Sequence, residues 1–170
     1  GSTAVLRAMR RRYTRESYLE LVEEIRRRLP ATALSTDMIV GFPGETEADF
    51  EDTLSLTRQV GFSSMFSFKY SPRPGTPAAE RAGVPEDVMN DRLQRVQALI
   101  TTHQRRRQDA MVGCNVKVLL EKPGRLAGQM VGKSEHLHAV HVSAPDAKIG
   151  DIVDVRIVNS VTNSLAGELA

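Results

Sequence analysis

The chain has 170 residues, of which 41% are hydrophobic and 26% charged, enough for one medium or two small hydrophobic cores in a soluble protein. Its single cysteine, Cys114, excludes an internal disulfide framework and cannot by itself hold a zinc ion or an iron–sulfur cluster. No apolar run approaches the ~20 residues needed to span a bilayer, so we expect a cytoplasmic protein that does not enter a membrane.

The net charge is only +2, but the basic residues are unevenly distributed. Three arginine triplets stand out, at residues 10–12, 26–28 and 105–107. A run of guanidinium groups is an electrostatic footprint for RNA, and it is equally common on solvated helix faces and at helix C-termini. Both interpretations stay open for each triplet.

The first half of the chain alternates predicted helices and strands. Thr14 is a suitable N-cap for an amphipathic helix, and Pro30 ends that helix. A strand is predicted over residues 34–40. Its apolar run at residues 38–40 is typical of a strand that is covered on both faces, as in a parallel sheet.

A sharp loop, Gly41-Phe42-Pro43-Gly44, follows this strand. Its two glycines supply unusual backbone angles and its proline fixes one. Thr46 then caps a helix that runs to about Val60. Asp49, three residues after Thr46, is the acceptor that completes a capping box. Small molecules bind outside the carboxyl ends of such strands, so the loop is a candidate ligand site. Loops of this kind also occur for steric reasons alone, and this one matches neither a P-loop nor a GxGxxG fingerprint.

A second strand is predicted over residues 64–70, in which aromatic and other residues alternate. Residues 71–84 are rich in proline and glycine and cannot be regular. A loop of this length is typically functional or covers something. Pro85 suits the first turn of a long helix that ends near residue 111, with His103 on a partly buried face.

Short β-rich segments separated by turn residues make up the rest of the chain. Strands are predicted at residues 116–120, 126–131, 138–143, 151–158 and 165–169. Five short strands in so short a stretch indicate a small closed barrel of the OB type, a shape that recurs in nucleic-acid binding.

Basic and hydrogen-bonding residues of this barrel are candidate RNA ligands: Lys122, Arg125, Lys133, His136 and His138. The two histidines are predicted to share a strand face. No further metal ligand is evident nearby, so we expect them to be RNA-facing or exposed and we predict no metal site. The barrel has no aromatic residue for base stacking, so recognition should rely on phosphate, sugar and base-edge contacts.

The barrel segment resembles the TRAM domain, an RNA-binding β-barrel. The resemblance covers about residues 112–170 and is carried by residues 118–121 (VLLE), 126–129 (LAGQ), 150–157 (GDIVDVRI) and 163–169 (NSLAGEL). It implies that this part of the chain contacts RNA.

The first half strongly resembles the radical S-adenosylmethionine methylthiotransferases, most closely the MiaB type that acts on tRNA. The carriers are residues 39–46 (IVGFPGET), the acidic helix after them, and residues 70–79 (YSPRPGTPAA). The resemblance implies an α/β fold that is a fragment of a partial TIM-type barrel over residues 1–106. A small all-β, OB-like TRAM barrel, with the end of its linking helix, then occupies residues 107–170.

The family's mechanism is implied by the same resemblance. Reductive cleavage of S-adenosylmethionine at a four-iron four-sulfur cluster gives a deoxyadenosyl radical. A methylthio group from a second cluster is then added to C2 of an isopentenylated adenosine beside the tRNA anticodon. The cluster cysteines of the family are absent here, so we expect this segment alone to be inactive, with no catalytic residue of its own, and to need an upstream remainder of the same polypeptide.

The resemblance also implies site residues. The cofactor set is Arg11, Val40, Gly41, Phe42 and Pro43. Residues 40–43 would form the wall that holds S-adenosylmethionine, and Arg11 would pair with its carboxylate or position its ribose. The substrate set is Tyr70 and Arg73, which would meet the substrate at the barrel mouth.

Two other functions stay open: an RNA-binding module without catalysis, and the sister methylthiotransferase that modifies an aspartate of a ribosomal protein. Arg73 within SPRPGTP favours the tRNA type. We expect a monomer whose partner is the anticodon stem-loop of a tRNA. Gly1 and Ser2 are either native or the remnant of an expression tag.

Overall fold

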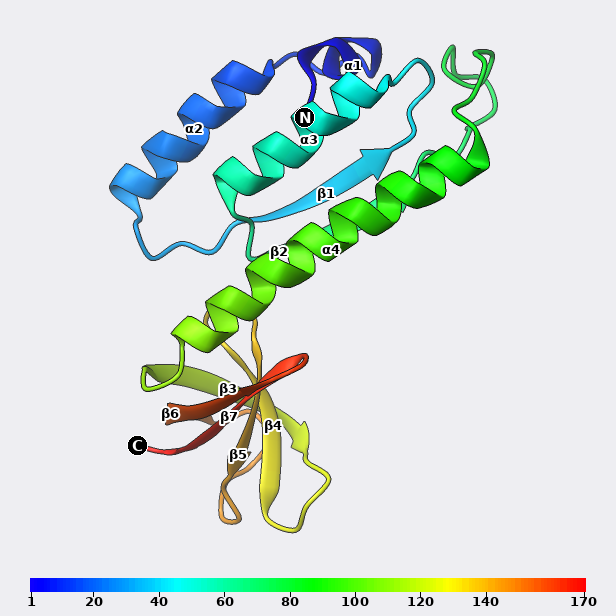
Figure 1. The fold of residues 1–170 in the computed structure, drawn as a ribbon. Helices are drawn as coiled ribbons and strands as arrows, with labels where there is room; N and C mark the ends of the chain where they lie inside the picture. Colours follow the sequence, from blue (N-terminus) through cyan, green and yellow to red (C-terminus); the bar gives the residue numbers. More distant parts are fainter. The chain divides into compact units, whose positions relative to one another are not determined.

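The computed structural model describes residues 1–170 and divides them into two compact units, Gly1–Gln104 and Arg105–Ala170. The sequence predicted a division between residues 106 and 107. Figure 1 traces the elements in chain order. None of the helices combines the length and the apolar character that crossing a membrane requires.

The first unit consists of four helices and a sheet of two parallel strands (Figure 1). In chain order its elements are α1 (Thr3–Ala8), α2 (Arg15–Arg28), β1 (Ser35–Val40), α3 (Glu47–Val60), β2 (Ser64–Lys69) and α4 (Glu86–Ala110), the last of which continues into the second unit. The carboxyl ends of β1 and β2 therefore lie at the same edge of the sheet, with Ile39 opposite Phe68 and Val40 opposite Lys69.

Side-chain caps fix where the helices begin. Thr14 and Ser17 form a reciprocal capping box at α2, and Thr46 and Asp49 form one at α3. Gly61, in the left-handed region with φ of 56°, ends α3. The predicted caps at Thr14 and Thr46 are confirmed.

Gly1 and Ser2 are integral to the fold. Ser2 is buried, its hydroxyl caps the short helix α1, and the same hydroxyl donates to Asp49 Oδ1 at 2.5 Å. A Cβ at Gly1 would lie 2.1 Å from the Cα of Thr53. The helix α1 was not predicted from the sequence.

Helices cover only one face of the two-stranded sheet. Val40 packs in a buried cluster with Phe50, Leu54 and Val96. The opposite face exposes Ile39 to 41%, Phe66 to 65% and Phe68 to 51%. The prediction that the strand at residues 38–40 is covered on both faces is therefore wrong for this chain, because the face that carries Ile39 is largely exposed.

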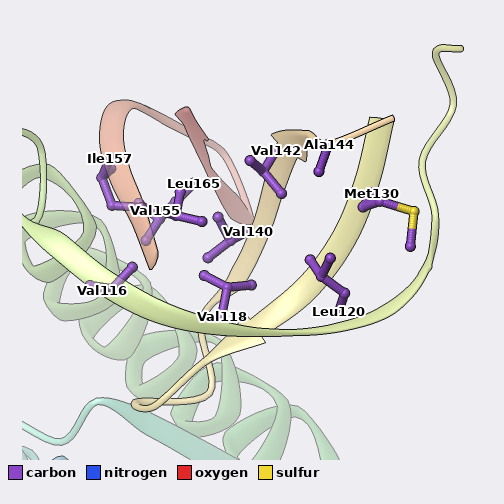
Figure 2. Packing of buried hydrophobic residues seen from close by; sticks show 10 residues of the cluster. All are labelled: Val116, Val118, Leu120, Met130, Val140, Val142, Ala144, Val155, Ile157 and Leu165. Atoms are coloured by element: carbon purple, nitrogen blue, oxygen red, sulfur yellow. The ribbon is translucent and has the colours of Figure 1, made fainter. Parts of the chain in front are cut away.

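The second unit is a closed five-stranded barrel in the order β3-β4-β5-β7-β6, with one parallel pair, β5 and β7. The strands are β3 (Asn115–Pro123), β4 (Gln129–Ser134), β5 (Ala139–Ser143), β6 (Ile152–Val161) and β7 (Ser164–Leu169). Alternate residues turn inward, as Figure 2 shows for ten apolar side chains: Val116, Val118, Leu120, Met130, Val140, Val142, Ala144, Val155, Ile157 and Leu165. The prediction of five strands in a small closed barrel is confirmed.

Strand boundaries differ from prediction mainly at β4, which begins at Gln129 and not at residue 126. Gly128 adopts φ of 70°, and the Gln129 side-chain oxygen accepts a hydrogen bond from the Arg125 N–H at 3.1 Å. These contacts extend the turn before β4. The turn was predicted as strand because Leu126 is apolar.

Candidate functional site

The loop between β1 and α3 is held by hydrogen bonds within itself. The Gly41 N–H donates to Glu45 Oε2 at 2.7 Å, and the Glu45 N–H donates to the Phe42 carbonyl at 2.8 Å. Gly41 and Gly44 have φ of 75° and 88°, the left-handed region that favours glycine. A Cβ at Gly41 would also lie 2.3 Å from Met89 Cγ, so residue 41 has both a backbone and a steric reason to be glycine.

Glu45 is a buried carboxylate, with a residue exposure of 6%. Burial raises the pKa of its carboxyl group, and the hydrogen bond from Gly41 and the charge of Arg92 act in the opposite direction. Arg92 Nη1 lies 2.9 Å from Glu45 Oε2. Arg92 of α4 therefore anchors the loop through Glu45.

An open cleft of about 860 Å³ lies at the carboxyl ends of β1 and β2. The α1–α2 turn and the loop after β2 also contribute to its lining. Its apolar wall contains Ile39, Phe42 and Phe68, together with the ring of Tyr70. This is the position, outside the ends of parallel strands, where ligands of α/β proteins bind.

Tyr70 brings an unpaired polar group to the wall of the cleft. Its ring packs edge-on against Phe42, with centroids 5.1 Å apart and planes at 74°. Its hydroxyl oxygen is buried and has no hydrogen-bond partner. A buried unpaired hydroxyl costs about 1–3 kcal/mol, so a polar ligand atom placed here would recover that free energy.

The rim of the cleft is basic. Arg10, Arg11, Arg73 and Arg81 line it, and no aspartate or glutamate does. None of these four arginines forms an ion pair within the chain. Arg10 has φ of 58°, which is uncommon for a residue other than glycine and is frequent at functional sites. The geometry suits a ligand with an aromatic part and negative charges.

A second arginine triplet, at residues 26–28, serves the helix surface instead. Arg26 donates to the Val60 carbonyl, whereas Arg27 and Arg28 bind the carboxylate of Glu24. For this triplet the interpretation as a solvated helix face is confirmed.

The cleft thus brings together four of the seven residues expected to hold cofactor and substrate: Arg11, Phe42, Tyr70 and Arg73. Val40, Gly41 and Pro43 do not line it, and the Val40 side chain is fully buried on the helix-covered face of the sheet. Sequence reasoning missed Arg10 and Arg81. Sequence reasoning also missed Ile39, because Met38, Ile39 and Val40 are all apolar and nothing in the sequence shows which of them faces the cleft.

In the barrel, Lys122 and Lys133 lie on the outer face of the β3–β4 pair, and Arg125 lies in the loop that joins these strands. No acidic side chain pairs with any of the three. Lys117 on β3, by contrast, pairs with Asp154 at 3.0 Å. The three unpaired cations are free to meet phosphate groups.

The two candidate histidines do not share a strand face, and this prediction is wrong. His136 lies in the turn after β4, and His138 just precedes β5. The Ser134 hydroxyl accepts from the backbone N–H of both, which shapes a tight turn with Leu137 at φ of 63°. His138 is buried, not exposed or RNA-facing, and its Nε2 has no partner. No group of three or more His, Cys, Asp or Glu side chains in the chain is arranged to hold a metal ion.

His138 should make the barrel sensitive to acid. Burial, with Arg107, His136 and Lys133 nearby, lowers its pKa below the ordinary value of 6.5. The unfolded chain therefore binds a proton that the folded barrel excludes, and stability falls as the pH drops through about 6.5. We expect the urea midpoint of the Arg105–Ala170 unit to decrease as the pH is lowered from about 7 to 5. The midpoint is measured on the whole chain, by amide exchange of the barrel strands.

The matched variant for this expectation is His138→Gln, which keeps a polar side chain but cannot titrate. It should show a flatter dependence of the midpoint on pH over the same interval. Identical slopes for parent and variant would assign the acid sensitivity to other groups.

Comparison with known families gives two matches. Residues 1–57 match the family described as the radical SAM superfamily, and residues 109–170 match the TRAM domain. The first match includes β1 and the loop that follows it, and the second includes the whole barrel.

Three curated relatives are similar over nearly the whole chain, and each is named tRNA-2-methylthio-N(6)-dimethylallyladenosine synthase. The protein of Cereibacter sphaeroides (strain ATCC 17029 / ATH 2.4.9) is 62% identical over 168 residues, which are 99% of this chain and 38% of the relative. That of Ruegeria pomeroyi is 62% identical over 170 residues, with 39% of the relative covered. That of Jannaschia sp. is 58% identical over 170 residues, which are 99% of this chain, with 37% of the relative covered.

The chain therefore spans less than two fifths of the length of these relatives. The similarity is high and runs through both the cleft-forming unit and the barrel. By these matches the chain is similar, over nearly all of its length, to part of proteins named tRNA-2-methylthio-N(6)-dimethylallyladenosine synthase, and it carries one region that matches the radical SAM superfamily and one that matches the TRAM domain.

Proposed function

We propose that the chain is part of a tRNA methylthiotransferase. It supplies two parts of that enzyme: one wall of the cofactor cleft, and the RNA-binding barrel. The whole enzyme adds a methylthio group to C2 of isopentenyl-adenosine next to the anticodon, by radical S-adenosylmethionine chemistry. The observation that carries this proposal is the cleft at the ends of β1 and β2, with an aromatic wall and an arginine rim that contains no carboxylate.

The aromatic wall of the cleft fits the adenine ring of S-adenosylmethionine. The cofactor carries two positive charges and one carboxylate, so a single arginine of the rim suffices for it and the other arginines suit the phosphates of a tRNA. Phe42 and Ile39 offer apolar surface to an adenine ring, and the unpaired Tyr70 hydroxyl offers a hydrogen bond within the same wall. Arg11, which lines the same cleft, would pair with the cofactor's carboxylate. When bound, S-adenosylmethionine supplies the radical that abstracts hydrogen from the substrate. The residues of this chain orient the cofactor and exclude water around it.

The chain does not fit an iron–sulfur cluster. Cys114 is its single cysteine and lies exposed in the barrel unit, and no group of possible metal ligands gathers elsewhere. Both clusters of the enzyme therefore take their ligands from the remainder of the polypeptide, which the greater length of the relatives accommodates.

That remainder also has a place to pack. The open sheet face with Ile39, Phe66 and Phe68 is too apolar to be left in water by an isolated domain. Further strands beside β1 and β2 would cover it and extend the sheet into a partial TIM-type barrel, with this face inside. The tRNA then approaches the cleft at Arg73 and Arg81, and the barrel unit contacts its phosphates. The enzyme works in the cytoplasm.

Product analysis tests the function. The full reading frame that contains this chain is expressed in a bacterial strain that makes isopentenyl-adenosine but lacks its methylthio derivative. Nucleosides from digested tRNA are then separated and identified by mass spectrometry. The proposal expects the methylthio derivative to appear. It should fall strongly when Phe42→Ala and Tyr70→Phe are combined, because the cofactor wall is lost.

Two results would overturn the proposal. Methylthiolation of an aspartate in a ribosomal protein, with unmodified tRNA, would favour the sister enzyme. Neither product, with tRNA binding retained, would favour an RNA-binding module without catalysis.

A further inference from the structure

The loop that follows β1 is tied to α4 by an acid–base pair that is almost fully buried. The side chains of Glu45 and Arg92 are only 2% and 5% exposed. Glu45 Oε2 accepts from the Gly41 N–H at 2.7 Å and from Arg92 Nη1 at 2.9 Å. Arg92 Nη1 also donates to the Glu45 carbonyl at 3.2 Å. One carboxylate oxygen thus closes the loop and fastens it to the helix.

A second contact from the same helix meets the other end of the loop. Met89 lies against Gly41, so closely that a Cβ at residue 41 would be 2.3 Å from Met89 Cγ. Met89 and Arg92 are three residues apart and share one face of α4. The helix therefore holds both Gly41 and Glu45.

Arg92 is itself fixed in place. Its guanidinium lies 5.5 Å from the centre of the Phe50 ring and 3.3 Å from a Glu47 oxygen. Its neighbour Arg95 also lies over Phe50 but binds only exposed carboxylates, those of Glu47, Glu51 and Asp91. Arg95 shares the environment of Arg92 without touching the loop.

Global stability alone does not explain this arrangement. Replacing a buried ion pair by apolar side chains is often neutral or stabilising, because desolvation offsets the attraction between the charges. What the pair provides here is shape. It fixes the orientation of the Gly41 peptide, in a loop whose two glycines would otherwise sample many conformations.

We infer that Glu45 and Arg92 are positioning residues: through Gly41 and the Glu45 backbone they fix the shape of the loop, and so they hold Phe42 in the cleft wall that the adenosyl cofactor contacts. Neither side chain lines the cleft. They act on the cofactor only through the loop, and Met89 supports the same shape by packing. This inference rests on the proposed binding of S-adenosylmethionine in the cleft.

The test uses the full polypeptide with its clusters and measures two quantities, the dissociation constant of S-adenosylmethionine and amide exchange of the peptide containing residues 40–46. Glu45→Ala removes both hydrogen bonds of the carboxylate and should weaken cofactor binding about tenfold while speeding exchange. Glu45→Gln keeps an acceptor for Gly41 and should weaken binding less. Arg92→Met should weaken it, and Arg92→Lys should restore part of the loss.

Arg95→Met is the matched control, since it removes an arginine from the same helix and the same aromatic ring but leaves the loop contacts intact. It should lower the melting temperature without changing cofactor affinity or loop exchange. Phe42→Ala reports on the cleft wall directly.

If Glu45→Gln, Glu45→Ala and Arg92→Met lose thermal stability but bind the cofactor like the parent, while Phe42→Ala does not, the positioning role is overturned and the cleft assignment stands. If Phe42→Ala also binds like the parent, the cofactor site itself has been placed wrongly.

Discussion

Replacing Gly41 by alanine is expected to destabilise the Gly1–Gln104 unit by about 2–5 kcal/mol. Two costs add at this residue. The left-handed backbone, with φ of 75°, costs a residue with a Cβ about 1–2 kcal/mol. The new methyl group would in addition lie 2.3 Å from Met89 Cγ, and overpacking of this kind costs roughly 1–3 kcal/mol. The measurement is urea unfolding of the whole chain, followed by amide exchange of β1 and α3.

Two other glycines provide matched controls. Gly44 and Gly75 have φ of 88° and 78°, but a Cβ at either would meet nothing within 4 Å. Their alanine variants should therefore show the backbone cost alone, about 1–2 kcal/mol. Shortening Met89 to alanine should recover part of the loss in Gly41→Ala but none in Gly44→Ala. Equal losses for all three glycines would refute the steric argument.

Changing Lys122, Arg125 and Lys133 together to alanine should lower affinity for an anticodon stem-loop roughly tenfold or more, about 1.4 kcal/mol in total. The barrel offers no aromatic platform, so charge must supply much of its affinity. These three cations are unpaired and gather around the β3–β4 hairpin. The logarithmic slope of affinity against salt should fall by about 2–3, with little change in sequence preference.

Lys117→Ala is the control for this series, because Lys117 also lies on β3 but is paired with Asp154. Its loss should change neither affinity nor salt slope appreciably. Binding of the triple variant with parental affinity and slope would mean that RNA meets another surface. The arginines at the rim of the cleft would then be the better candidates.

Much of the fold follows from local sequence signals. Thr14 and Thr46 are followed at the right spacing by partners that complete their capping boxes, and those contacts are local. Inward-facing valines and leucines alternate with outward-facing residues along the barrel strands. This two-residue period, together with the turn residues between the segments, is enough to predict the number of strands. The short helix α1 escaped prediction because its cap, Ser2, is stabilised by Asp49, which is far away in the sequence.

The site was harder to predict because it depends on which face of a strand is covered. Met38, Ile39 and Val40 look alike in sequence, yet Val40 is buried under helices and Ile39 lines the cleft. His138 was misplaced for a related reason. The hydrogen bonds of Ser134 fold residues 134–138 into a turn, which moves one histidine off the strand and buries the other. Neither outcome is visible in composition or spacing.

The most direct test of the account is a structure of the full polypeptide bound to S-adenosylhomocysteine, which lacks the reactive methyl group. The account predicts adenine density against Ile39 and Phe42, a polar ligand atom within hydrogen-bonding distance of the Tyr70 hydroxyl, and the ligand carboxylate near Arg11. Ligand density elsewhere, with the Tyr70 hydroxyl still unpaired and the cleft filled by protein, would contradict it.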